Sequence, residues 1–144
     1  RNLNSASIDD VSPEEIKETF SLFTDWEDKY RYIIDLGKEL PELHEKDKIE
    51  KNLIRGCQSQ VWLTHNINPE GSIHLDMDSD AHIVRGLIAI VLAALNDKLP
   101  RQIIEFDVEL LFSDLELLEH LSPTRGNGLR AMVQRVQSVA ESSI

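Results

Sequence analysis

The chain has 144 residues, of which 41% are hydrophobic and 28% charged, and it carries a net charge of −11. This composition is typical of a folded globular protein and excludes a disordered chain. The acidic balance disfavours nucleic acids and anionic membranes as partners, and the longest apolar run, residues 87–95, is too short to cross a bilayer. We expect residues 1–11 to form a flexible polar tail and residues 12–144 to form a single domain.

Two helices are predicted in the first third of the chain. The run Ser12–Glu15 begins the first with a serine cap, a proline in the first turn and a glutamate three residues after the cap. The apolar residues that follow fall on one helix face: Ile16, Phe20 and Phe23. A similar capping pattern at residues 24–27 begins the second helix, which ends before Pro41, and residues 42–52 are predicted to be a polar loop.

Three short strands are predicted next, at residues 53–54, 61–63 and 72–77. The last of them alternates apolar and polar residues, as a half-buried strand does. Residues 67–71 have the Asn, Pro and Gly content of a tight turn and separate two of the strands. Together they predict a small antiparallel sheet.

Helices are predicted again after the sheet. Residues 81–95 are almost wholly apolar after Arg85 and predict a central buried helix, in which Gly86 would let the helix approach the sheet closely. Residues 101–121 predict one or two amphipathic helices, and Ser122 begins a last helix that runs to about Ala140. The order of helices, strands and helices predicts an α+β fold, with a small antiparallel three-stranded sheet packed against several helices.

Cys57 is the only cysteine, and it lies in a polar turn between two predicted strands. One thiol cannot form an internal disulfide or a multi-cysteine metal site. No signal-type apolar segment is visible, so we expect a reducing, cytoplasmic setting. Gly56 lets the backbone turn and leaves space beside the sulfur, and Gln58 and Ser59 supply polar groups. These neighbours suit a reactive cysteine and a structural cysteine equally, and the local sequence does not decide between the two.

The other polar residues carry weaker signals. No histidines have metal-ligand spacing; His65 and His74 could face each other across the predicted hairpin, and His82 is the best candidate for a base near Cys57. Asp76, Asp78 and Asp80 lack the glycine and the distal glutamate of a calcium loop, so we interpret the run 78–80 as a helix cap.

Arg125 is placed near a helix start, where the helix dipole does not favour a cation. It is predicted either to be a solvated surface residue or to pair with a carboxylate or a partner.

Residues 56–63, with the sequence GCQSQVWL, resemble the signature of the SufE/CsdE family of sulfur acceptors. Other motifs of that family match in the same order at residues 26–30, 36–41, 78–87 and 121–129. The cysteine loop is closer to the SufE branch and the N-terminal helix to the CsdE branch. The resemblance implies an α+β fold shared with IscU-type iron–sulfur scaffolds, whose several cysteines this chain lacks.

The resemblance also implies a function. A cysteine desulfurase that contains pyridoxal phosphate would hold sulfur as a persulfide and transfer it to Cys57, which would pass it to an iron–sulfur scaffold or another acceptor. The protein would then activate the desulfurase rather than turn over alone, as a monomer or homodimer with no cofactor or metal of its own. Candidates for the cysteine loop or the partner surface are Gly56, Gln58, Ser59, Asp78, Asp80, Arg85 and Arg125.

Two other functions remain open at this point. The first is a cysteine-nucleophile enzyme, such as a small hydrolase or a thiol peroxidase, which needs a base or a cation close to Cys57. The second is a non-catalytic interaction module in which Cys57 is incidental.

Overall fold

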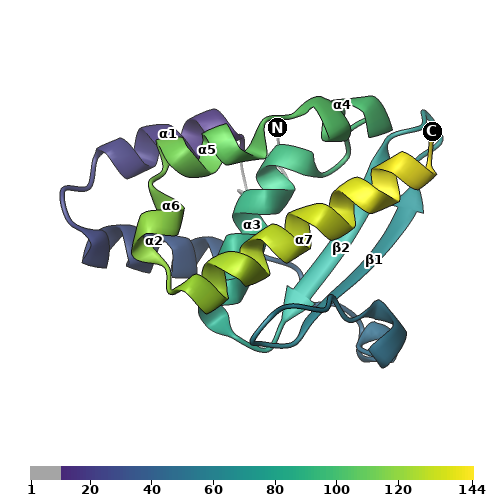
Figure 1. The fold of residues 1–144 in the computed structure, drawn as a ribbon, viewed down its shortest axis with the longest axis horizontal. Helices are drawn as coiled ribbons and strands as arrows, with labels where there is room; N and C mark the ends of the chain where they lie inside the picture. Colours follow the sequence, from purple (N-terminus) through teal and green to yellow (C-terminus); the bar gives the residue numbers. More distant parts are fainter. Residues whose placement is uncertain (1–10) are drawn as a thin grey trace.

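The computed structural model describes residues 11–144, so all but the last residue of the expected tail, residues 1–11, lies outside the described residues. Helices surround a single hairpin in this part of the chain (Figure 1). The elements in chain order are α1 (Pro13–Ser21), α2 (Trp26–Lys38), the 3₁₀ turns η2 (Glu45–Asp47) and η3 (Glu50–Asn52), β1 (Val61–Ile67), β2 (Ile73–Ser79), α3 (His82–Leu95), α4 (Pro100–Glu105), α5 (Val108–Asp114), α6 (Leu117–His120) and α7 (Pro123–Ser142).

Capping side chains set the starts of the long outer helices. Ser12 accepts a hydrogen bond from the backbone N–H of Glu15 at the start of α1 (3.2 Å), and Ser122 does the same for Arg125 at the start of α7 (3.2 Å). Both predicted starts are confirmed. In α2 the capping residue is Asp25, whose carboxylate accepts from the N–H of Asp28 (2.9 Å). Each cap provides an acceptor for an N–H group that the helix itself leaves free.

The sheet is an antiparallel hairpin of β1 and β2, with a register that runs from Val61 opposite Ser79 to Ile67 opposite Ile73. The α+β fold and its small antiparallel sheet are therefore confirmed. The strand predicted at residues 53–54 is reduced to one bridge between Leu53 and Trp62, because the chain leaves the sheet at once in the loop 55–60.

The register also corrects the expectation for two histidines. His65 pairs with Leu75 and His74 pairs with Asn66. Since successive strand residues point to opposite faces, His65 and His74 lie on different faces of the hairpin and do not face each other.

Residues 101–121 form three short helices, α4, α5 and α6, rather than one or two. Two local features divide them. Asp107 caps α5 by accepting from the N–H of Leu110 (3.0 Å), and Glu116 takes a left-handed backbone conformation (φ 54°) between α5 and α6. Apolar spacing alone does not reveal such interruptions.

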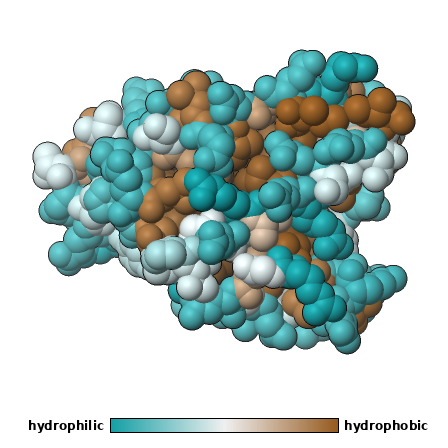
Figure 2. All heavy atoms as spheres, viewed as in Figure 1, coloured by the Kyte–Doolittle hydropathy of each residue, from teal (hydrophilic) through white to brown (hydrophobic). Residues whose placement is uncertain are grey.

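The core is centred on α3, as predicted. Its residues Leu87, Ile88 and Ile90 are fully buried, and the helix contacts α1, α2, α7 and β2. α7 runs diagonally across the molecule in Figure 1 and packs against α3 and α4. Figure 2 shows that apolar side chains on this face gather at the end where α4 and the C-terminus of α7 lie. Within residues 11–144, no helix combines the length and the apolar character needed to span a membrane.

Two glycines let α2 and α3 pack backbone to backbone. A Cβ atom on Gly86 would lie 2.1 Å from the carbonyl oxygen of Ile33, and one on Gly37 would lie 2.6 Å from the backbone nitrogen of Gly86. Gly86 therefore lets α3 lie close to α2. The prediction that this glycine lets the helix lie close to the sheet was wrong. The reason is that α2, a helix distant in sequence, covers this face of α3.

This contact predicts the effect of Gly86→Ala. The added methyl group would collide with backbone, which cannot rotate away, so we expect the free energy of unfolding to fall by at least about 2 kcal/mol in urea titrations. Gly126→Ala is the control, because its Cβ atom would meet only the terminal methyl group of the Leu118 side chain, at 3.3 Å. We expect that control to change stability by less than about 1 kcal/mol. Equal stability of the two variants would contradict the close approach.

Candidate functional site

Cys57 lies on a loop, residues 55–60, that is held at both ends. The N–H of Ile54 donates to the carbonyl of Val61 (2.8 Å), and the N–H of Gln60 donates to the Asp80 carboxylate (3.1 Å). Between these ends the chain makes a local turn at residues 55–56, and no backbone–backbone hydrogen bond joins residues 55–59 to the rest of the described chain. Gly56 has φ +91°, a conformation that side chains disfavour. The loop is thus anchored at its base, and few polar contacts hold its tip.

The thiol of Cys57 is half-buried and points toward α7. It donates a hydrogen bond to the carbonyl oxygen of Gly128, with a Sγ–O distance of 3.6 Å. The sulfur lines a cavity of about 10 Å³, which has room for about one water-sized group. The other lining residues come from the loop, β1, α3 and α7: Gln58, Ser59, Val61, Val84, Leu87, Arg125, Gly128, Leu129 and Met132.

The cavity favours the protonated thiol. Burial raises the pKa of Cys57 above its ordinary value, because the thiolate would lose hydration. The hydrogen bond to Gly128 also requires the thiol proton. Arg125 is the only charged residue among those that line the cavity, and His82 is not among them. The cavity therefore does not supply the base that a cysteine-nucleophile enzyme requires.

Arg125 projects from the first turn of α7 and is half-buried. Its guanidinium makes no hydrogen bond or ion pair with the described residues, although it lines the Cys57 cavity. The suggested pairing with a carboxylate of this chain is not seen. A cation is thus available beside the cysteine loop.

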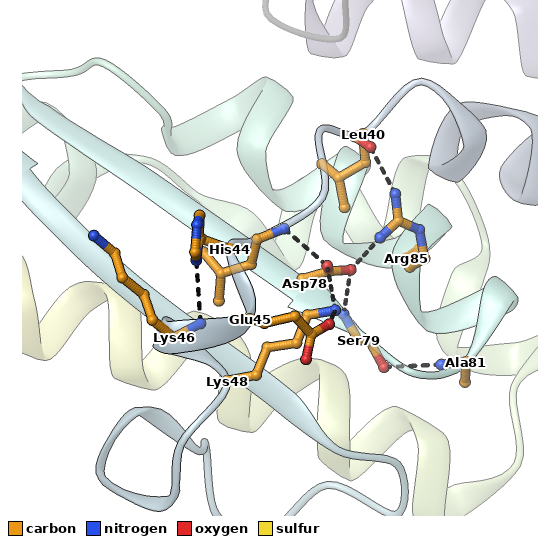
Figure 3. A network of polar contacts seen from close by, with 10 residues as sticks. Leu40, His44, Glu45, Lys46, Lys48, Asp78, Ser79, Ala81 and Arg85 are labelled. Atoms are coloured by element: carbon orange, nitrogen blue, oxygen red, sulfur yellow. Dashed lines mark hydrogen bonds and ion pairs between the residues drawn. The ribbon is translucent and has the colours of Figure 1, made fainter.

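Asp78 is the centre of a buried polar network (Figure 3). The carboxylate is 1% exposed, and it accepts from the N–H groups of Leu43 (3.0 Å) and Ser79 (2.7 Å). The Arg85 guanidinium pairs with the same carboxylate and donates to the carbonyl of Leu40 (2.6 Å). One carboxylate thus joins β2, α3 and the segment that follows α2.

This network corrects the interpretation of residues 78–80 as a helix cap. The N-cap of α3 is Ala81, which makes no side-chain capping bond. Asp78 belongs to β2 and pairs with Arg85, while Asp80 binds the backbone of Gln60 and so closes the cysteine loop. The capping prediction failed because the strand continues through residue 79, which moves the start of the helix beyond the acidic run.

Lys48 extends the network toward β1. Its Nζ lies 3.1 Å from the Glu45 carboxylate and 3.7 Å from that of Asp78, and 5.7 Å from the centre of the Trp62 ring. The hydrogen bond to Glu45 is the main cause that raises the pKa of Lys48. Trp62 is buried, and its ring lies beneath this lysine.

The predicted candidate residues thus fall into two groups. Gln58, Ser59 and Arg125 line the cavity with Cys57, and the loop residue Gly56 precedes it, whereas Asp78 and Arg85 form the separate network. Asp80 lies at the base of the loop. The apolar wall of the cavity was not predicted from the sequence, and its residues come from α3 and α7: Val84, Leu87, Leu129 and Met132. Val84 and Leu87 lie in the family motif at residues 83–87 and Leu129 lies in the motif at residues 121–129, whereas Met132 lies outside both motifs and carried no signal.

Comparison with known proteins places this geometry in a family. A family model described as SufE, Fe-S metabolism associated domain, matches residues 14–140. The chain belongs to the SufE family. A SufE-like protein of Rhizobium meliloti (strain 1021) is 43% identical over 137 residues, which cover 93% of this chain and 98% of that protein. The sequence resemblance is therefore confirmed, and the SufE family connects the chain with iron–sulfur metabolism.

A solved structure shares the SufE-family fold. The solution structure of a hypothetical protein from Thermus thermophilus superimposes with a TM-score of 0.71 and covers 92% of this chain and 98% of its own. The two sequences are 18% identical, so this likeness concerns the fold alone.

The buried network predicts a large loss of stability for Asp78→Asn. The amide removes the charge that faces Arg85, whose side chain is only 15% exposed. We expect the free energy of unfolding in urea to fall by about 3–5 kcal/mol. The control is Asp76→Asn on the same strand, where the side chain is 43% exposed and pairs with His74 at 3.3 Å. We expect less than about 1 kcal/mol there, and equal losses in both variants would contradict the role of Asp78.

Proposed function

We propose that the protein is a sulfur carrier that accepts persulfide sulfur on Cys57 from a cysteine desulfurase and delivers it for iron–sulfur cluster assembly. One observation carries the proposal. The chain's single cysteine lies within the segment matched by the SufE family, and its sulfur faces an apolar cavity with room for about one more atom-sized group. Such a cavity suits the terminal sulfur of a persulfide between transfers.

The proposed transfer step is a thiol exchange. The Cys57 thiolate attacks the terminal sulfur of the donor's cysteine persulfide. A sulfur–sulfur bond forms at Cys57, the donor's sulfur–sulfur bond breaks, and the donor cysteine leaves as a thiolate that can take up the proton that Cys57 lost. The step consumes no oxidant or reductant, and neither metal nor cofactor is required on the acceptor.

The closed loop disfavours this attack, because burial raises the pKa of the Cys57 thiol. We infer that the desulfurase draws the loop 55–60 out of the cavity, so that the thiol regains water and ionises more readily. The few hydrogen bonds along residues 55–59 support this movement. Removal of sulfur from the desulfurase would in turn speed its turnover.

The remaining assignments follow from the same proposal. Pyridoxal phosphate belongs to the desulfurase, and the downstream partner is an iron–sulfur scaffold or another sulfur acceptor. A free thiol that must stay reduced suits a reducing compartment such as the cytoplasm. Gly56, Gln58, Ser59 and Arg125 would form the surface that meets the partner.

Intact-mass measurement tests the proposal. The protein is mixed with a cysteine desulfurase, pyridoxal phosphate and free cysteine, without reductant. We expect the mass to increase by one or more sulfur atoms and the increase to be reversed by a reducing thiol. Cys57→Ser is the matched variant, because it replaces only the sulfur. It should gain no sulfur but should still compete with the wild-type protein for the desulfurase.

Two outcomes would overturn the proposal. If the mass does not increase with any of several desulfurases, Cys57 does not accept sulfur. If Cys57→Ser gains sulfur as the wild-type protein does, the acceptor lies elsewhere in the chain.

A further inference from the structure

The two chain segments that meet at Cys57 are cationic, although the whole chain has a net charge of −11. Residues 51–63 carry the cysteine loop, and residues 121–140 form most of the helix that covers the thiol. Neither segment contains an aspartate or a glutamate. Their cations are Lys51, Arg55, Arg125, Arg130 and Arg135.

Three of these cations surround the cysteine loop. Arg55 lies two residues before Cys57, and its side chain is 82% exposed. Arg125 lines the Cys57 cavity. Arg135 reaches from α7 to the other segment and donates to the carbonyl of Leu53 (3.4 Å), close to the base of the loop. We call these three residues the cationic rim.

Acidic side chains of the same chain neutralise the cationic rim only partly. Glu50 lies 3.7 Å from Arg55, but both side chains are 82% exposed, and such pairs are weak in water. The Asp80 carboxylate accepts from the N–H of Gln60 at the base of the loop. No acidic side chain pairs with Arg125 or Arg135 among the described residues. Within the two segments that meet at Cys57, the cationic side chains are therefore not matched by acidic side chains of the same segments.

We propose that the cationic rim docks on an acidic protein surface that surrounds the donor cysteine of the desulfurase. This inference rests on the sulfur-carrier function proposed above. Opposite charges at the two cysteines would speed the encounter and orient it. The acidic remainder of the chain would be repelled by the same surface, so that approaches which turn Cys57 away from the donor would be disfavoured.

Charge reversal at Arg55 tests the inference. Arg55→Glu changes an exposed side chain that makes one weak ion pair, so the fold should be preserved. The control is Arg101→Glu, which makes the same charge change at an exposed position of α4, an element that lies far from the cysteine loop (Figure 1). Lys51→Glu, exposed on η3, provides a second test variant.

The measurement is the association rate with the desulfurase that loads Cys57 in the mass assay, at low salt and at about 1 M salt. For the wild-type protein we expect the rate to fall as salt rises. At low salt we expect Arg55→Glu to associate about three- to tenfold more slowly and Lys51→Glu to be slowed in the same direction, with Arg101→Glu within about twofold of the wild type. At about 1 M salt, where charges are screened beyond about 3 Å, the differences should disappear.

The outcomes separate this inference from the function on which it rests. If Cys57 is loaded with sulfur but Arg55→Glu and Arg101→Glu slow association equally, or the wild-type rate does not fall with salt, the acidic docking surface is refuted and the carrier function stands. If the wild-type protein is never loaded, the carrier function fails, and this inference fails with it.

Discussion

The buried carboxylate of Asp78 is the interaction on which the arrangement around the site depends. A charged group that is 1% exposed is stable only when it is paired and hydrogen-bonded. Here the bonds come from Leu43, Ser79 and Arg85, which belong to three different parts of the chain. The network therefore fixes the end of β2 against the start of α3. Asp80, two residues further on, then holds the base of the cysteine loop.

Because its base is fixed, the cysteine loop is anchored at its ends and only weakly held at its tip. Its ends are bonded to β1 and to Asp80, while its tip rests against α7 mainly through the Cys57 thiol and its apolar neighbours. A tip held in this way encloses the sulfur without a rigid lid. Enclosure has a chemical consequence, since the buried thiol has a raised pKa and is a poor nucleophile while the loop is closed. Under the proposed function, protection belongs to the closed position of the loop and reactivity to a released one.

Local signals in the sequence were sufficient for much of the fold. The serine caps at residues 12 and 122, the turn at 67–71 and the apolar run 81–95 each act over a few residues, and the structure has the corresponding elements. The polar turn around Cys57 was visible for the same reason. All of these features depend on residues that are neighbours in the sequence.

Contacts between distant residues could not be predicted in this way. Gly86 packs against Ile33, and Asp78 binds the N–H of Leu43, which lies 35 residues away in sequence. The acidic run 78–80 resembles a helix cap locally, and only the pairing of β2 with β1 shows that it begins within a strand. The cavity wall at Cys57 comes from α3 and α7, so spacing around the cysteine gave no sign of it.

The proposed sulfur transfer requires the donor protein to release the cysteine loop from its cavity. Amide hydrogen exchange, measured with and without the desulfurase that loads Cys57, tests it most directly. We expect altered exchange at residues 55–60 and in the turn of α7 around Gly128, with unchanged exchange in the paired parts of β1 and β2. Unchanged exchange at residues 55–60, under conditions in which Cys57 is loaded with sulfur, would contradict it.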